Sequence, residues 1–483
     1  MNRQSRAGSL KRGKLPTIRL GSQPPITDAQ AGQIRGLIAQ LAAINKPYFG
    51  LSGTLSGSGF APLEGQESSG AFLLTNHALS VPESLKTLVA LGAKALPFLL
   101  EALDNPTPTQ LTIKAHPSGG MFYEMSLHHN PVNSAEQGIS QSQLTQARAA
   151  LGKDIPSYTV TVGDVCFVIL GQIVGREYQA IRYQPTLCIV VNSPVHDPAL
   201  CATVRSIWRS DNPMQKLFNS LCEDYASVGV YDKKSLDDWD AADALICGAA
   251  LRLLYYFPQE ATALLVKRLD DLKAGKDRDV DAYIRRCIAN GGVRSENLLK
   301  ALTWSKSPAV RAAITRVFRR TNNSSTLKAA LPSVDDIALI RHRLEPHIAA
   351  LPRRNDEDGP YGDGYNFLLA LCKRTPSTTE AVFSRYLRGA RPERCYTACL
   401  ILREVRVTWA TKMLAPLLSD KRTWGYEYAV EKGKNKPCLP IRVCDEAAIT
   451  LCASHPKLMF VQQGTHAALD AQIATLRAAL ALR

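Results

Sequence analysis

The stretch from Ser80 to Asp104 constrains the fold most strongly, because it is typical of two short helices joined at a glycine. Ser80 and Glu83 have the spacing of a capping box, and Pro82 falls in the first turn, where an N–H is dispensable. Gly92 permits the chain to leave the first helix and turn. Both halves carry one apolar stripe, formed by Leu85, Leu88 and Val89 and then by Ala95, Leu96, Leu99, Leu100 and Leu103. Neither helix can bury its stripe alone, so the stretch predicts stacking against similar units.

Similar apolar spacing recurs further along the chain. Ser377 and Glu380 predict another capping box at one of these copies. The copies comprise Leu251, Leu254, Pro258, Ala261, Leu265, Leu269 and Asp270; Cys287, Gly291, Leu298, Leu299 and Leu302; Leu369, Cys372, Pro376, Phe383 and Leu387; and Leu414, Leu417, Leu418 and Asp420.

These units resemble HEAT repeats, the helix-turn-helix units that stack into α-solenoids. The resembling core is Leu85-x-x-Leu88-x-x-Leu91-Gly92-x-x-Ala95-x-x-x-Leu99-x-x-x-Leu103-Asp104. The intervals from Leu269 to Leu302 and from Leu387 to Leu418 are each nearer ~33 residues than the ~40–47 typical of such repeats. The resemblance implies an all-α solenoid whose concave surface binds a partner.

The pattern predicts two regions, a disordered basic tail over residues 1–26 and a single solenoid over residues 27–483. Insertions are expected near residues 49–79, 105–158 and 423–440, where the helical spacing is interrupted. Within the solenoid, Thr27 and Gln30 predict a capping box that opens a helix reaching about Asn45. Val162–Arg176 is apolar almost all round and is therefore expected to be a buried helix.

Composition indicates a folded soluble protein, with 45% hydrophobic and 21% charged residues among 483. The longest apolar run, residues 165–174, is too short to span a bilayer, and the first residues lack the apolar core of a secretory signal. The twelve cysteines include no Cys-x-x-Cys pair, and several lie in apolar helical patterns. Many unpaired thiols favour a reducing compartment, so a cytoplasmic location is expected.

The net charge of +15 is concentrated in two stretches without acidic residues. Residues 1–27 hold six Lys and Arg, and the segment between Glu296 and Asp335 holds seven. In the second stretch, one predicted helix face carries Arg311, Arg316, Arg319 and Arg320, opposite Val310, Ile314, Val317 and Phe318. Such an arginine cluster suits an acidic protein partner or a phosphate, whereas the plainer alternative is a solvated face that keeps the helix soluble.

The other candidate sites can each be explained by a structural role instead of a binding role. Trp424, Tyr426 and Tyr428 alternate like a strand before Lys432, Lys434 and Lys436, a combination used for single-stranded nucleic acid. The preferred interpretation is a hairpin loop that packs its aromatic residues on the solenoid edge. His77, His116, His128 and His129 lack metal-site spacing and are expected to be loop residues. An acidic helix start, which the helix dipole alone would favour, is formed by Asp237, Asp238, Asp240 and Asp243.

No phosphate-binding loop, nucleophile elbow or dinucleotide fingerprint is present in the sequence. The chain is therefore expected to be a non-enzymatic scaffold for a protein partner, with no catalytic residue, metal site, cofactor or membrane association. The alternative is a nucleic-acid-binding solenoid that uses the basic tail and the 308–320 helix. The sequence leaves the oligomeric state open.

Overall fold

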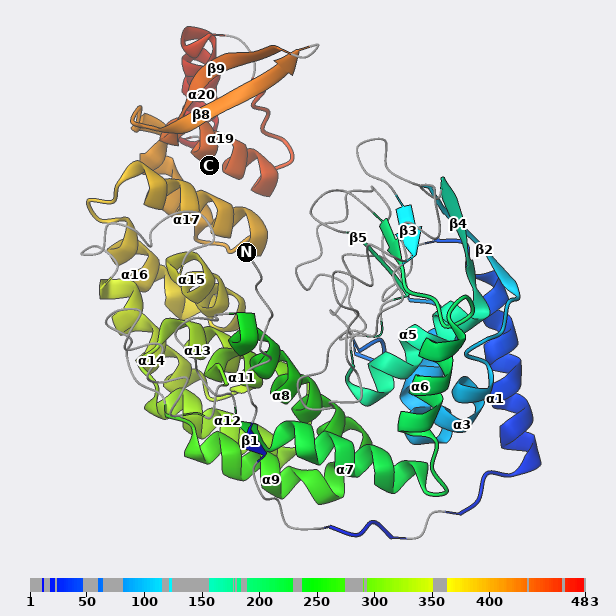
Figure 1. The fold of residues 1–483 in the computed structure, drawn as a ribbon. Coiled ribbons are helices and arrows are strands. Elements are labelled where there is room, and N and C mark those ends of the chain that lie inside the picture. The colour runs from blue at the N-terminus through cyan, green and yellow to red at the C-terminus, as the bar shows by residue number, and fades with distance from the viewer. Residues whose placement is uncertain are drawn as a thin grey trace, which may run out of the picture. The chain divides into compact units, whose positions relative to one another are not determined.

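The chain was analysed as a computed structural model, which describes residues 11–12, 18–21, 24–46, 60–63, 81–114, 121–123, 156–176, 178, 180–183, 189–228, 237–273, 290, 293–350, 363–431, 434–462 and 465–481. It is mostly helical, which agrees with the predicted all-α class (Figure 1). Within the described ranges, no helix combines the length and the apolar character needed to cross a membrane. The chain divides into two compact units, Met1–Ile314 and Thr315–Arg483.

The first unit is built mainly from helices, and its described part includes two 3-10 turns, η1 (Leu41–Ala43) and η3 (Gly92–Lys94). Its described α-helices are α1 (Asp28–Gln40), α2 (Glu83–Leu91), α3 (Leu96–Glu101), α5 (Val162–Val174), α6 (Pro198–Trp208), α7 (Pro213–Tyr225), α8 (Asp237–Tyr256), α9 (Pro258–Asp271) and α11 (Ser295–Leu302). The unit boundary falls inside the next helix, α12 (Pro308–Arg320).

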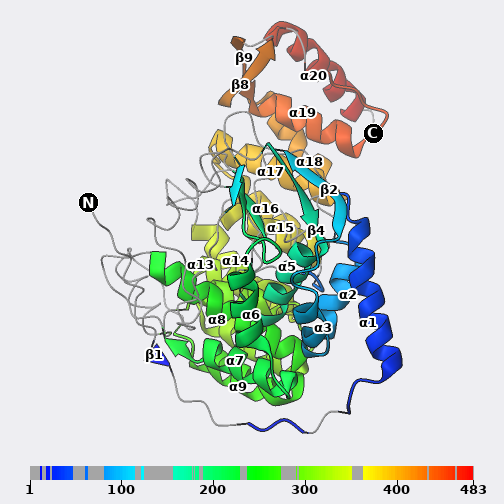
Figure 2. The ribbon, with the colours of Figure 1, turned by 45° about the vertical axis from the view of Figure 1, so that its right-hand side comes forward.

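The predicted helix pair after residue 80 corresponds to α2 and α3, which lie beside α1 (Figure 2). Helix α2 begins at Glu83 with Pro82 as its N-cap residue and no side-chain cap. The predicted capping box involves Ser80, which lies outside the described residues. The predicted hinge at Gly92 is confirmed, because this residue ends α2 with a φ of 56°. Such a backbone conformation favours glycine, which has no Cβ.

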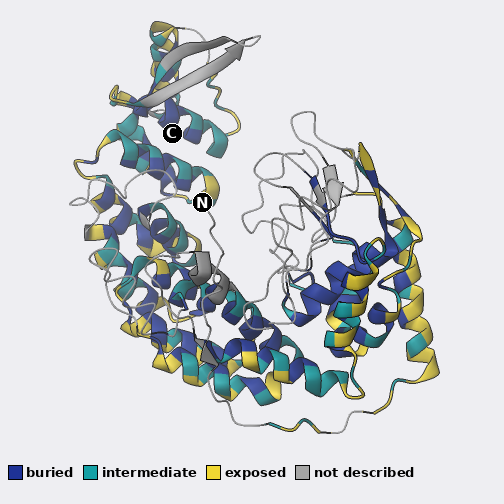
Figure 3. Ribbon diagram, viewed as in Figure 1, coloured by how far each residue is buried: buried dark blue, intermediate teal, exposed yellow. Residues whose placement is uncertain are grey.

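Helix α5 forms the centre of the first unit, packed against α2, α3 and α7, and all of its residues are buried (Figure 3). The prediction of a buried helix from Val162 is therefore confirmed. Its N-terminus is closed by a capping box between Thr161 and Asp164. The hydroxyl of Tyr158 also donates a 2.6 Å hydrogen bond to Asp164. The first N–H groups of this buried apolar helix also find acceptors, because those of Val162 and Gly163 donate to the carbonyls of Thr107 and Asn105.

The second and third predicted copies coincide with α8–α9 and α11. Helix α8 ends at Tyr256, and Pro258 occupies the first turn of α9, where its missing N–H has no helical partner. Leu265 and Leu269 on α9 are fully buried, as are the three predicted leucines of α11, whereas Cys287 and Gly291 lie outside the described residues. The helices pack on their neighbours in sequence, α7 on α8 and α8 on both α9 and α11.

The first unit also contains short β-strands. The described pairs are β2 (Pro108–Lys114) with β4 (Ser157–Thr161), β3 (Met121–Tyr123) with β6 (Ile189–Val191), β5 (Ile181–Tyr183) with β6, and β1 (Lys11–Arg12) with β7 (Ser227–Val228). The β3–β6 pair is parallel and the others are antiparallel.

Part of the predicted basic tail has defined partners. Beyond the β1–β7 pairing, Gln215 of α7 accepts a hydrogen bond from the Leu20 N–H at 2.9 Å and donates one to the Ile18 carbonyl at 3.1 Å. Charge and composition cannot reveal these contacts, because the partner residues lie about two hundred positions away. The domain boundaries at residues 26 and 27, and the insertions, stay predictions.

The second unit continues the helical series. Its helices are α13 (Ser324–Ala330), η4 (Leu331–Ser333), α14 (Ile337–Ala350), α15 (Asp363–Arg374), α16 (Pro376–Leu387), α17 (Pro392–Val405), α18 (Ala410–Leu414), η6 (Ala415–Ser419), α19 (Val443–Ser454) and α20 (His466–Ala481). Helix α15 packs against α14, α16 and α17, and α17 packs against α19.

The capping box predicted from Ser377 is wrong. Helix α16 begins two residues earlier than that box requires, at Pro376, with Thr375 in the N-cap position and no side-chain cap. The Thr375 hydroxyl instead donates to the carbonyl of Leu371, at the end of α15, at 3.0 Å. The proline at the first helical position, rather than the polar tetrapeptide, sets where this helix starts.

The predicted interruption after residue 423 is a hairpin of β8 (Thr423–Glu431) and β9 (Lys434–Arg442), paired antiparallel. Trp424 at its base stacks on Tyr396 of α17, with ring centroids 4.9 Å apart and planes inclined by 21°. The other strand is anchored at the same base, where Arg442, which pairs with Thr423, forms a buried ion pair with Asp445 of α19 at 2.8 Å.

Candidate functional site

Helix α12 presents two chemically opposite faces, as the sequence predicts. Val310, Ile314, Val317 and Phe318 are fully buried. Arg316, Arg319 and Arg320 are exposed, and Arg311 is half-buried. At 3.6 residues per turn, the four arginines spread over roughly half of the helix circumference.

Small side chains separate the arginines on this face, which we call the arginine face (Arg311, Arg316, Arg319 and Arg320). Ala309 and Ala312 are exposed between them, and no acidic residue occurs from position 297 to 334. Small neighbours allow a partner to approach the helix closely, and guanidinium groups match carboxylate and phosphate oxygens in paired geometry. Arg311, Arg316 and Arg320 also interact with other groups of the chain.

The C-terminal end of α12 offers a structural role for some of these charges. Arg319 and Arg320 lie in the last turn, where positive charge is stabilised by the helix dipole. Arg343 of α14 closes the same end by donating to the Thr321 carbonyl and, at 2.6 Å, to Asn322. The arginine face is thus held on a helix whose end is capped by a second element.

The remaining candidate residues do not form a binding or catalytic site among the residues that the structure describes. Trp424 is packed on Tyr396, which favours the hairpin interpretation over base stacking. Lys432 and the four candidate histidines, His77, His116, His128 and His129, lie outside the described residues. Among the residues that the structure does describe, no three His, Cys, Asp or Glu side chains are grouped to hold a metal ion.

The described cysteines are suited to packing rather than nucleophilic chemistry. Burial raises the pKa of Cys395 to about 11 and that of Cys372 to about 12. Desolvation also raises the pKa of Cys166 and Cys399. Thiols with such pKa values remain protonated near neutral pH, whereas the thiolate is the reactive form.

A buried polar cluster that the sequence did not indicate lies beneath α5. Arg176, just after this helix, forms an ion pair with Asp224 of α7 and donates to Ser220 at 3.1 Å. Arg252 of α8 is only 1% exposed and donates to the carbonyl of Gln172 at 2.6 Å. Burial raises the pKa of the Asp224 carboxyl, opposed by the charge and hydrogen bonds of Arg176. The cluster ties α5, α7 and α8 together.

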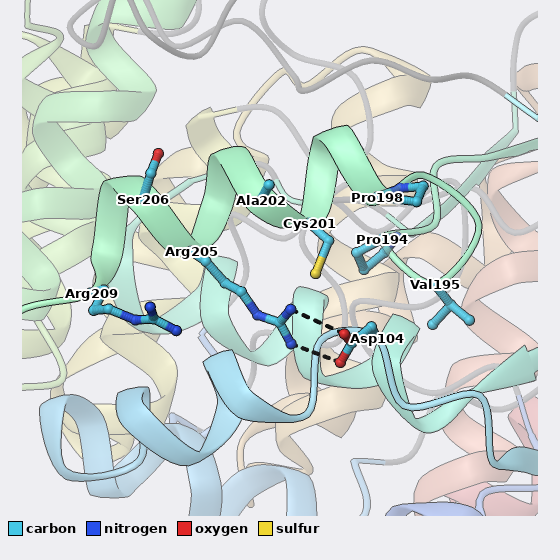
Figure 4. A pocket seen from close by; sticks show the side chains of 9 residues that line it. All are labelled: Asp104, Pro194, Val195, Pro198, Cys201, Ala202, Arg205, Ser206 and Arg209. Atoms are coloured by element: carbon cyan, nitrogen blue, oxygen red, sulfur yellow. Dashed lines mark hydrogen bonds and ion pairs between the residues drawn. The ribbon is translucent and has the colours of Figure 1, made fainter.

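A pocket of about 410 Å³ lies along α6 (Figure 4). Its polar groups include Asp104, Arg205 and Arg209, and its apolar wall includes Pro194 and Val195. Arg205 binds both oxygens of Asp104, at 2.7 and 3.0 Å. The hydrogen bond from Arg205 lowers the pKa of the Asp104 carboxyl. The sequence does not indicate this pocket, because Asp104 and Arg205 are about one hundred residues apart along the chain.

No family model, curated protein or solved structure matches this chain. The HEAT-repeat resemblance therefore stays a prediction from the repeat pattern.

Proposed function

We propose that this chain is a HEAT-like α-solenoid that works as an interaction scaffold, binding an acidic segment of a protein partner on the arginine face of α12. Support for the repeat arrangement comes from helix pairs broken at a glycine or a proline, α2–α3 at Gly92, α8–α9 at Pro258 and α15–α16 at Pro376. Several consecutive helices pack on one another, such as α7 on α8, α8 on α9, α14 on α15 and α15 on α16, which is how repeats bury their apolar stripes.

The observation that carries the binding proposal is the division of α12 into a buried face and an arginine face. Val310 and Phe318 are fully buried and hold the helix in its position. Arg316 and Arg319, on the opposite side of the helix, are exposed. A rigid support lowers the entropy that a binding side chain must lose. No acidic residue occurs between positions 297 and 334, so this stretch carries a net positive charge, which favours an anionic partner.

The second candidate is a nucleic acid, because the same guanidinium groups match phosphate oxygens. It is favoured by the basic N-terminal stretch, which holds six Lys and Arg and no acid over residues 1–27. We prefer a protein partner because Trp424, a candidate for stacking on a nucleic-acid base, is packed on Tyr396 instead.

A charge-reversal pair tests the proposal. The R316E/R320E variant and a matched control, R388E/R477E, change the net charge equally, and all four arginines are exposed residues of the second unit. Fluorescence anisotropy would measure binding of a labelled glutamate-rich peptide and of single- and double-stranded oligonucleotides. We expect peptide binding to fall at least tenfold in R316E/R320E and to persist in the control.

Equal peptide binding by wild type and R316E/R320E would overturn the proposal. Tighter binding of oligonucleotide than peptide, lost in the same variant and falling steeply with added salt, would establish the nucleic-acid alternative instead. Circular dichroism of both variants would verify that helix content is unchanged.

A further inference from the structure

We propose that the α6 pocket binds a short aliphatic carboxylic acid in its anionic form, with the carboxylate at Arg209 and the hydrocarbon chain along the pocket wall. This site is separate from the arginine face and does not depend on the proposed scaffold role.

The charges of the pocket favour a ligand with one negative charge. Arg205 and Asp104 neutralise each other through a two-bond ion pair (Figure 4). Arg209 follows one helical turn later and is exposed, and no acidic side chain pairs with it within the described part of the chain. The pocket thus carries one uncompensated positive charge. A second negative charge on the ligand would meet repulsion from Asp104.

The other lining groups favour a hydrocarbon body. Pro194, Val195, Pro198 and Ala202 present apolar atoms to the pocket. Cys201, also in the lining, is 3% exposed, and burial raises the pKa of its thiol, so it adds a neutral, weakly polar surface. Ligand pockets commonly combine such an apolar lining with a few polar groups that fix orientation.

Hydrogen bonds hold the Arg205 side chain in place without a ligand. Besides its bonds to Asp104, Arg205 donates from Nε to the Leu100 carbonyl at 2.8 Å and from a terminal nitrogen to the Glu101 carbonyl at 3.1 Å. These carbonyls end α3, so Arg205 fastens α6 to the C-terminal end of that helix. Figure 4 shows the side chains of Arg205, Arg209 and Cys201 on the same side of α6. The volume of about 410 Å³ is in the range typical of small-molecule sites.

The test uses the full chain and defined probes. Ligand-observed NMR and isothermal titration would compare butyrate, hexanoate and octanoate with hexanamide, which has the hydrocarbon chain but no charge. We expect hexanoate to bind about fifteenfold more tightly than butyrate, because it has two more methylenes and each buried methylene contributes about fourfold. Hexanamide should bind at least about tenfold more weakly than hexanoate.

Two variants locate the site. R209M keeps an unbranched apolar stem and removes the charged guanidinium, and we expect it to weaken hexanoate binding at least about tenfold. The matched control is R477M, at an exposed arginine of α20. A202W fills the pocket from an exposed helix position and should abolish binding. Circular dichroism would verify that each variant is folded.

Failure of hexanoate to bind the wild-type chain would overturn the proposal. So would equal affinity of hexanoate for R209M and wild type, or equal affinity of wild type for hexanamide and hexanoate. Retained binding in folded A202W would place the ligand elsewhere and would equally reject the pocket.

Discussion

Arg176 and Asp224 form an ion pair with only 4% and 1% of their side chains exposed. Arg176 also lies over the ring of Trp208, 5.6 Å from its centroid. Trp208 in turn donates to the Tyr178 hydroxyl at 2.9 Å. One buried charge pair therefore links the end of α5 to both α6 and α7.

We predict that Asp224→Ala destabilises the protein by about 3–5 kcal/mol, because it leaves the guanidinium of Arg176 buried without a counter-charge. Urea denaturation followed by circular dichroism would measure the change in the free energy of unfolding. Replacing both partners by apolar residues, as in R176M/D224L, should recover most of this loss.

The exposed pair between Lys267 and Asp271, with 75% and 64% of the side chains exposed, supplies the control. D271A should leave the urea midpoint unchanged, because exposed pairs are screened by water and salt. A D224A midpoint equal to that of D271A would contradict the role assigned to the buried pair.

We predict that the contribution of Asp104 to stability disappears in acid. Its pKa in the folded protein is lowered, chiefly by the hydrogen bond from Arg205, below the value of 3.8 of an ordinary aspartate. A carboxyl with a lowered folded pKa stabilises the fold above its unfolded pKa, and this stabilisation is lost as pH falls through the folded pKa. The free-energy difference between wild type and D104N should be present at pH 7, shrink as the pH nears 3.8, and vanish only once the pH is below the lowered folded pKa.

Because Asp104 is 55% exposed and Arg205 26% exposed, we expect the difference at neutral pH to be only about 0.2–1 kcal/mol. Urea titrations at several pH values would resolve the trend. A difference between wild type and D104N that grew as the pH fell would be incompatible with the lowered pKa.

We predict that Gly92→Ala destabilises the first unit by about 1–3 kcal/mol. A Cβ at this position would lie 2.6 Å from Cε1 of Tyr256, and the φ of 56° is unfavourable for any side chain. The Tyr256 ring cannot easily retreat, because its hydroxyl donates a 2.6 Å hydrogen bond to the Val89 carbonyl. Thermal and urea denaturation would measure the loss.

Gly36→Ala is the matched control. Gly36 lies inside α1, and no atom within 4 Å would meet its added Cβ. Alanine there should stabilise the helix by about 0.5–1 kcal/mol. The same sign of change for G92A and G36A would show that the turn at Gly92 does not require glycine.

We predict a favourable coupling of about 0.5–1.5 kcal/mol between Trp424 and Tyr396, in addition to the area that each ring buries. The two rings stack with centroids 4.9 Å apart, joining β8 to α17. A double-mutant cycle of W424A, Y396A and the combined variant would measure the coupling from urea denaturation. Strict additivity of the two single changes would reject the stack as a stabilising contact.

Local patterns predicted several elements well. The capping box of Thr27 and Gln30, the hinge at Gly92 and the buried helix from Val162 all follow from neighbouring residues, and the structure contains each of them. Ser377 shows the limit of this reasoning, because a polar tetrapeptide fits the capping pattern even when a proline starts the helix earlier.

Asp243 shows a second limit. The sequence placed it in an acidic helix start favoured by the helix dipole. In the structure it is 4% exposed and accepts a hydrogen bond from the Arg294 N–H at 2.8 Å and another from the Asn297 side chain. Burial raises the pKa of its carboxyl, against the lowering effect of these bonds. It joins α8 to α11, a role that no local pattern could indicate.

The sequence by itself determined the helical class, the hinge at Gly92 and the two faces of α12, because each depends on residues within a few turns of one another. Only the tertiary structure decided the polar contacts. Arg205 meets Asp104 across 101 positions and Arg176 meets Asp224 across 48. Hydrogen bonds and ion pairs depend on distances between groups in space, and the spacing of residues along the chain does not fix those distances.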